Sequence, residues 1–196
     1  MKEKTKNIIR VVTLFIIATA ALIGVFKSNQ SKVTQNADEF IMDVNYFVVQ
    51  FKLMLNQLDL PQDEEINHKI DEVFHINDIQ KVVDINKIDH EIVKIIFTEY
   101  DFSKPSLMTL ENGYRPSTAS WFMEEIRSLR KKCDENLYRY DGDTELIRNI
   151  KVLKDQINDV VIMYSMNGEL NSCLSSLNCF FNTLKASLNN VRKFRK

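Results

Sequence analysis

Apolar residues recur at helical spacing once the chain passes residue 40. In the first such segment they are spaced alternately by four and three positions: Phe40, Val44, Phe47, Phe51, Met54 and Leu58. A stripe with this spacing stays on one face of an α-helix. The pair Leu60-Pro61 then disfavours helical backbone. The sequence therefore predicts a long amphipathic helix that ends before Pro61.

Two shorter segments follow before the middle of the chain. A short helix is predicted with Ile66, Ile70, Val73 and Phe74 facing inward. A second helix is predicted to begin at Asn77 or Asp78, either of which can act as its N-cap. Its inward positions are Ile79, Val82, Val83, Ile88, Ile92 and Ile96.

Three long helices are predicted in the second half of the chain. The first begins at Ser117, Thr118 or Ser120 and carries Phe122, Ile126, Leu129, Cys133 and Leu137. The next begins after Gly142 with Asp143 as its cap and carries Leu146, Ile150, Leu153, Ile157, Val160 and Tyr164. The last carries Leu170, Leu174, Leu177, Phe181, Leu184, Leu188 and Val191.

The turn-forming residues fall between these helices. Outside the N-terminal segment, every glycine and proline lies in a predicted break: Pro61, Pro105, Gly113, Pro116, Gly142 and Gly168. Asn167-Gly168 is also a β-hairpin signal, but both of its flanks have helical periodicity, which favours a helical hairpin. The predicted fold is all-α, an antiparallel bundle of about four to five helices over residues 38–196.

The spacing near 3.5 residues indicates small crossing angles between the helices. An intermolecular coiled coil has the same spacing, so a homo-oligomer stays open as an alternative. The short breaks between helices favour a chain that folds back on itself.

Residues 11–26 form an uncharged, apolar run that differs from the rest of the chain. At about 1.5 Å per residue it is shorter than a bilayer core of about 30 Å, a difference that snorkelling of Arg10 and local thinning of the bilayer accommodate. The sequence predicts a single transmembrane helix in residues 1–27, followed by a polar linker at 28–37. Its anchor residues are Val11, Val12, Leu14, Phe15, Ile16, Ile17, Leu22, Ile23, Val25 and Phe26.

A cleaved leader is the alternative interpretation of this segment. The basic start and Ala18-Thr19-Ala20 are typical of a signal peptide with its cleavage site. The apolar run continues past Ala20, however, so an uncleaved signal anchor is favoured. Four Lys or Arg residues precede the run and two soon follow it, which predicts a cytoplasmic N-terminus and an extracytoplasmic body.

Charge and motifs restrict the chemistry of the body. The first 27 residues hold five cations and one anion, a net +4, which leaves −5 for the rest of a chain of net charge −1. Nucleic-acid binding is not expected, because it usually requires a basic surface. The sequence contains no phosphate-binding glycine loop and no serine nucleophile elbow. No enzymatic activity and no cofactor are therefore expected.

Two Glu-x-x-His pairs raise the question of a metal site. Glu65, His68, Glu72 and His75 lie on one face of the short predicted helix. Di-metal bundles take such pairs from different helices, with further glutamates from two more. A solvated polar face is the favoured interpretation, and a metal-binding bundle is the third functional hypothesis.

The cysteines and the C-terminus give weaker signals. Cys133, Cys173 and Cys179 form no Cys-x-x-Cys pair and are most simply buried small residues, although Cys133 can pair with either of the others in an oxidising compartment. The basic ending "VRKFRK" complements a helix C-terminus or contacts anionic headgroups or an acidic partner.

The longest predicted break, residues 101–118, is the candidate partner-binding loop. Loops of this length are uncommon in compact domains and are often functional. Its candidate contact residues are of types enriched at binding hot spots, namely Phe102, Tyr114, Arg115 and nearby Trp121. The alternative is a simple crossover whose aromatic residues pack inward.

These observations predict a membrane-anchored, non-enzymatic protein that acts through a protein partner as an accessory, scaffold or inhibitory subunit. The alternative is an extracytoplasmic small-ligand sensor, whose architecture of a tether and a helical bundle is similar. That function requires a pocket with convergent polar groups between the helices.

Overall fold

The computed structural model describes residues 2–59, 61–78, 80–140 and 144–195. Within these ranges it describes all side chains except those of residues 2–21, 23, 26, 29, 30 and 195. The regular elements of the described chain are all helical, which confirms the all-α prediction, and an isolated β-bridge joins Pro105 and Ser117.

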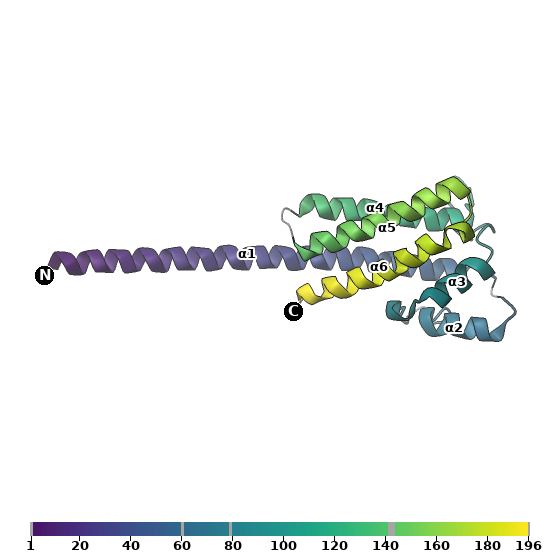
Figure 1. The fold of residues 1–196 in the computed structure, drawn as a ribbon, viewed down its shortest axis with the longest axis horizontal. Coiled ribbons are helices and arrows are strands. Elements are labelled where there is room, and N and C mark those ends of the chain that lie inside the picture. Colours follow the sequence, from purple (N-terminus) through teal and green to yellow (C-terminus); the bar gives the residue numbers. More distant parts are fainter. Residues whose placement is uncertain (1, 60, 79, 141–143, 196) are drawn as a thin grey trace.

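Four long helices form an antiparallel bundle: α1 (Lys2–Leu55), α4 (Thr118–Arg139), α5 (Glu145–Asn167) and α6 (Leu174–Arg192). Figure 1 shows that successive members of this set alternate in direction and that α1 projects far beyond the other three. Gly168 ends α5 in the left-handed conformation at φ 68°, and its amide donates to the Tyr164 carbonyl at 2.7 Å. The Asn167-Gly168 break is therefore a helical hairpin, as predicted.

Two short helices, α2 (Glu64–Phe74) and α3 (His90–Glu99), are inserted between α1 and α4. The prediction of a helix beginning at Asn77 or Asp78 is wrong. The Asp89 carboxylate caps the amide of Ile92 and starts α3 there. The described residues before it, 76–78 and 80–89, form a loop around the short 3-10 helix η1 (Ile85–Lys87). In this loop Val83, Ile85 and Ile88 are buried, but Val82 is 85% exposed. Ile79 lies outside the described residues.

The remaining helix starts follow the sequence in part. The Ser117 hydroxyl accepts the amide of Ser120 and caps α4, so of the three predicted caps Ser117 is the one used. Gly142 and Asp143, predicted to separate α4 from α5, lie outside the described residues. The 3-10 helix η2 (Asn171–Cys173) precedes α6, and η3 (Lys193–Arg195) follows it.

The backbone of α1 is helical from the apolar N-terminal run into the bundle. Residues 28–37, the predicted polar linker, are part of this helix, and Ala37 is already buried. The side chains of all predicted anchor residues except Leu22 and Val25 lie outside the described set, and these two are exposed. Among the residues that the structure describes, no helix is long and apolar enough to cross a membrane.

The core is built around the ring of Phe51. This ring lies 5.3–6.3 Å from five other rings, which come from α1, α2, α3, α4 and α6: Phe47, Phe74, Phe97, Phe122 and Phe181. Each of the six is fully buried. Aromatic pairs at such distances add roughly 0.5–1.5 kcal/mol each beyond the area that they bury. One side chain of α1 thus joins four other helices.

Replacing Phe51 with alanine is expected to lower the free energy of unfolding by roughly 3–5 kcal/mol, because the cavity is bounded by five rings that cannot all collapse into it. Tyr138→Ala is the control, since that ring is 93% exposed on α4. Urea unfolding of the full-length protein, followed by the fluorescence of the single tryptophan, Trp121, measures both. Equal stabilities of the two variants would contradict this account of the core.

Candidate functional site

Residues 101–117, hereafter the distal loop, lie at the end of the bundle opposite the projecting half of α1 (Figure 1). The loop folds back on itself, because the Ser106 amide donates to the Pro116 carbonyl at 2.8 Å and the Thr118 amide donates to the Lys104 carbonyl at 3.1 Å. Gly113 turns its tip at φ 77°. The predicted long break is therefore an ordered structure.

The distal loop is also attached to residues 57–59, which follow the C-terminal end of α1. The Gln57 side-chain oxygen accepts both the Ser106 hydroxyl and the Leu107 amide, each at 2.8 Å. Lys104 forms an ion pair with Asp59. These contacts join segments about fifty positions apart in the sequence, so local sequence patterns did not indicate them.

The structure separates the four candidate contact residues into two pairs. Phe102 is buried and stacks on Phe97 with 5.1 Å between the ring centroids, and Trp121 is buried with its indole N–H donating to Glu125 at 3.2 Å. Phe102 therefore holds the loop against the core, whereas Trp121 belongs to α4. Tyr114 and Arg115 are exposed, Tyr114 to 60%.

The exposed tip contains one residue that the sequence did not single out. This residue is Leu107, which is 71% exposed. We call Leu107, Tyr114 and Arg115 the loop tip. An aromatic ring, an aliphatic side chain and a guanidinium together are the residue types that protein interfaces favour.

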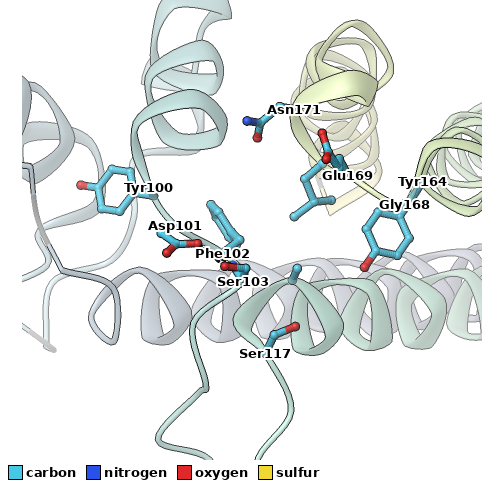
Figure 2. A pocket seen from close by; sticks show the side chains of 11 residues that line it. Tyr100, Asp101, Phe102, Ser103, Ser117, Tyr164, Gly168, Glu169 and Asn171 are labelled. Atoms are coloured by element: carbon cyan, nitrogen blue, oxygen red, sulfur yellow. Dashed lines mark hydrogen bonds between the residues drawn. The ribbon is translucent and has the colours of Figure 1, made fainter.

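A cleft of about 410 Å³, hereafter the distal cleft, lies beside the distal loop. Figure 2 shows Asp101, Phe102 and Ser103 on one side of it and the α5–α6 hairpin, with Tyr164 and Glu169, on the other. Further polar groups come from Ser117 at the start of α4 and from Asn171.

The charges that line the distal cleft are both negative. Hydrogen bonds from the hydroxyl and the amide of Ser103 hold the pKa of the Asp101 carboxyl below its usual value, which keeps that group ionised. Glu169 is exposed on the opposite wall. Burial raises the pKa of Tyr100 to about 12, so its phenol stays neutral. The arrangement suits a ligand that donates hydrogen bonds or carries positive charge.

The predicted Glu-x-x-His face is solvated where it lies on α2, but it does not include His75, which is the half-buried C-cap residue of that helix at φ 49°. His68 and Glu72 are 3.7 Å apart and largely exposed, while Glu65 pairs with Lys69 at 3.2 Å. Lys69 also forms an ion pair with Glu91 of α3 at 3.1 Å. The Glu65 carboxylate is thus paired with an ammonium group. No group of three or more metal-ligating side chains occurs among the described residues.

The three cysteines are free in the structure. Cys133 and Cys173 are buried, as expected, but the expectation of burial is wrong for Cys179, which is exposed on α6. The step of six residues from buried Cys173 places Cys179 on another side of the chain. Burial raises the pKa of the Cys133 thiol to about 12, so this group is unreactive.

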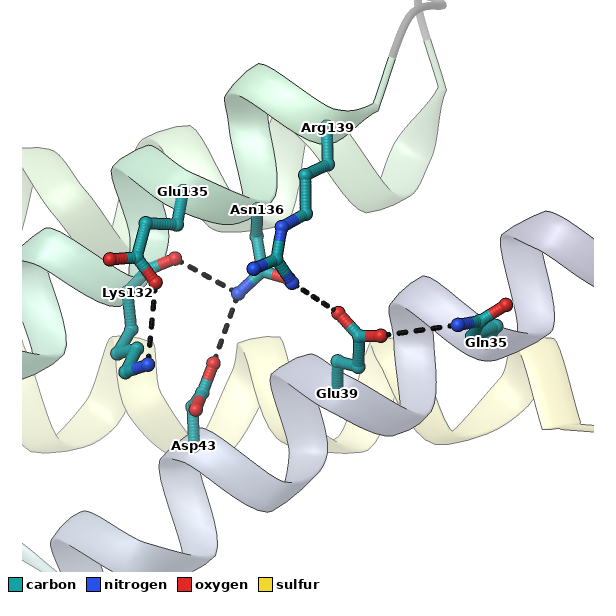
Figure 3. Close-up of polar contacts among 7 residues, drawn as sticks. All are labelled: Gln35, Glu39, Asp43, Lys132, Glu135, Asn136 and Arg139. Carbon is teal, nitrogen blue, oxygen red and sulfur yellow. Dashed lines mark hydrogen bonds and ion pairs between the residues drawn. The ribbon is translucent and has the colours of Figure 1, made fainter.

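At the opposite end of the bundle, polar contacts fix the register between α1 and α4 (Figure 3). The side-chain amide of Asn136, which is buried, donates to Asp43 at 3.1 Å and to the Lys132 carbonyl at 2.9 Å. Arg139 donates to Glu39 at 2.8 Å. Paired polar groups of this kind favour one alignment of two apolar stripes over a shifted one.

Comparisons with models of protein families, with curated proteins and with solved structures gave no match to this chain.

The Asp43→Asn variant is expected to be more stable than the wild type near pH 7. Burial, opposed in part by the Asn136 hydrogen bond, raises the pKa of Asp43, so the folded state binds more protons than the unfolded state between the two pKa values. Stability therefore falls as pH rises through that window and stays reduced above it. Asparagine keeps the acceptor for Asn136 without the charge.

The melting temperatures of both proteins at about pH 7 and about pH 3 measure this effect, and the advantage of the variant should disappear at the lower pH. Asp155→Asn, at an exposed position of α5, is the control. A variant less stable than the wild type at pH 7 would show that the charge of Asp43 stabilises the junction.

Proposed function

We propose that this chain is a membrane-anchored, non-enzymatic protein that binds a protein partner through its loop tip. The observation that carries the proposal is an ordered loop. Phe102 attaches this loop to the core and Gln57 attaches it to the turn after α1, yet Leu107 and Tyr114 are exposed to solvent. A preorganised loop loses little conformational entropy on binding.

The apolar run of residues 11–26 supports the membrane anchor, since a soluble helix that is apolar on all sides requires burial in a large protein. The flanking charges favour a cytoplasmic N-terminus. The backbone of α1 is helical without a break, which supports a stiff connection between the anchor and the bundle. The 11 residue steps from Phe26 to Ala37 measure about 16 Å along this helix. In this arrangement the loop tip faces away from the bilayer.

The proposal of an accessory, scaffold or inhibitory role rests on the lack of a catalytic motif in the sequence. The prediction that the chain can form a homo-oligomer is compatible with a membrane anchor. The small interfacial residues of the anchor, Gly24 and several alanines, are of the kind that pack against a neighbouring transmembrane helix.

The anchor is tested by the fate of the chain on alkaline extraction of membranes. The full-length protein should stay in the membrane pellet with its N-terminus intact, and a chain that starts at residue 28 should move to the supernatant, because it lacks the apolar run. Mass spectrometry of the N-terminus provides the second readout. A mature protein that begins at Ala21 would overturn the anchor in favour of a cleaved leader.

The partner site is tested by affinity recovery from detergent-solubilised membranes. A chain with Leu107, Tyr114 and Arg115 all changed to alanine should lose the proteins that the wild type recovers, because hot-spot truncations each cost about 2 kcal/mol or more. Tyr138→Ala is the matched control, since it removes an exposed ring from the other end of α4. Equal recovery by all three proteins would contradict the proposal.

The distal cleft favours a second candidate function, an extracytoplasmic sensor of a small ligand. Its volume lies within the usual range for ligand pockets, and Asp101 and Glu169 face it from different segments. A partner that is recovered equally by the wild type and by an Asp101→Asn, Glu169→Gln variant supports the first function. Dependence of recovery on an added solute and on these two carboxylates supports the second.

A further inference from the structure

A second groove, hereafter the lateral groove, lies on the side of the bundle between α1, residues 80–85 and the end of α6, and encloses about 320 Å³. It contains none of the residues of the distal cleft or the loop tip. Its walls are mainly aliphatic and come from three segments that are distant in the sequence: Val48, Val49, Leu53, Val83, Ile85 and Leu188. A ligand with an aliphatic chain fits such a surface.

The charged side chains that line the lateral groove are all basic, namely Lys52, Lys81 and Arg192. This contrasts with the acidic character of the chain beyond residue 27. Asp78 lies 3.7 Å from the Lys81 ammonium and offsets part of its charge, but Asp78 does not line the groove. An aliphatic surface with basic groups only is complementary to an anionic amphiphile.

The lateral groove contains a buried and hydrogen-bonded lysine, Lys52. Its side chain is only 5% exposed, and its ammonium donates to the carbonyls of Asp78 at 2.8 Å and Lys81 at 2.9 Å. Both acceptors are neutral, and an ammonium has three N–H groups, so one remains for a ligand. Burial lowers the pKa of the Lys52 ammonium, and the carboxylates of Asp78 and Asp71 oppose this only in part, so a further anion beside Lys52 is favoured.

We propose that the lateral groove binds a small anionic amphiphile, a monocarboxylate with a medium-length aliphatic chain. The carboxylate lies at the Lys52 and Lys81 end and accepts from the ammonium groups. The aliphatic chain lies along Val48, Val49 and Leu53 of α1 and against Val83. Arg192, the last residue of α6, is the third basic group of the lining. The groove volume, at the lower end of the range for ligand pockets, favours a small molecule over a protein segment.

The test uses decanoate with a photoreactive diazirine at its terminal carbon, added to the full-length protein in membranes. After illumination, mass spectrometry maps the labelled peptides. We expect saturable labelling of the peptides that contain Val49 or Val83. Unlabelled decanoate should compete with the probe about tenfold more effectively than decan-1-ol, because charge-assisted hydrogen bonds are worth roughly 1.5–3 kcal/mol.

Two variants keep the test independent of folding. Lys81→Glu reverses one exposed charge, and Val49→Asp places a charge on the half-exposed aliphatic wall, so neither removes a buried group. Each should reduce labelling of the groove about tenfold. Lys151→Glu, at an exposed position of α5, is the matched control and should leave labelling unchanged. The Trp121 fluorescence of each variant checks that it is folded.

Several results would overturn the proposal. One is labelling confined to residues 8–26 or spread evenly over the surface, which indicates partition into lipid alone. Equal competition by decan-1-ol, or unchanged labelling of Lys81→Glu, would show that the groove does not recognise the carboxylate charge. Cross-linking of the groove to a second copy or to another protein, with no competition by decanoate, assigns the groove to protein docking.

Discussion

Phe51 lies where five helices meet, and most of the functional geometry depends on that contact. Its ring packs against rings from α2, α3, α4 and α6, and so positions the inserted pair α2–α3 against the four-helix bundle. Phe97 and Phe122 extend the cluster to Phe102, the first buried residue of the distal loop. The loop tip is therefore placed by aromatic packing as well as by hydrogen bonds, which explains how a long connection is ordered.

Helix α1 connects the two ends of the molecule. Its N-terminal part contains the apolar run, Asp43 forms the polar junction with α4, and the turn after its C-terminal end holds the distal loop through Gln57. An α-helix resists bending over this length unless a proline, a glycine pair or a π-bulge interrupts it. A displacement of α1 relative to α4 would strain the Asp43–Asn136 contact. The same displacement would move Gln57, which holds the distal loop. Both proposed functions use this connection.

The distal cleft and the lateral groove have opposite chemical character. The distal cleft is lined by carboxylates and hydroxyls, whereas the lateral groove is aliphatic with basic groups. They share no lining residue, and they differ in how they are formed. The distal cleft lies between the distal loop and the α5–α6 hairpin. The lateral groove is formed because Lys52 holds the backbone of Asp78 and Lys81 beside α1. A buried cation that organises a loop thus also shapes a surface for an anion.

The sequence by itself determined the helices whose apolar stripes are continuous. The inward positions of α4, α5 and α6, the end of α1 before Pro61 and the helical hairpin at Gly168 were all predicted, because helical periodicity and backbone preferences are local properties. Only the tertiary structure decided the rest. Residues 79–88 have a helical pattern, yet Val83, Ile85 and Ile88 reach the core from a loop, because Lys52 fixes that backbone from another helix. Phe102 and Trp121 had the composition of a binding surface, but the ring cluster and Glu125 hold them inside. Both concave surfaces combine segments that are distant in the chain, and the free energy that joins such segments comes from contacts that no local pattern records.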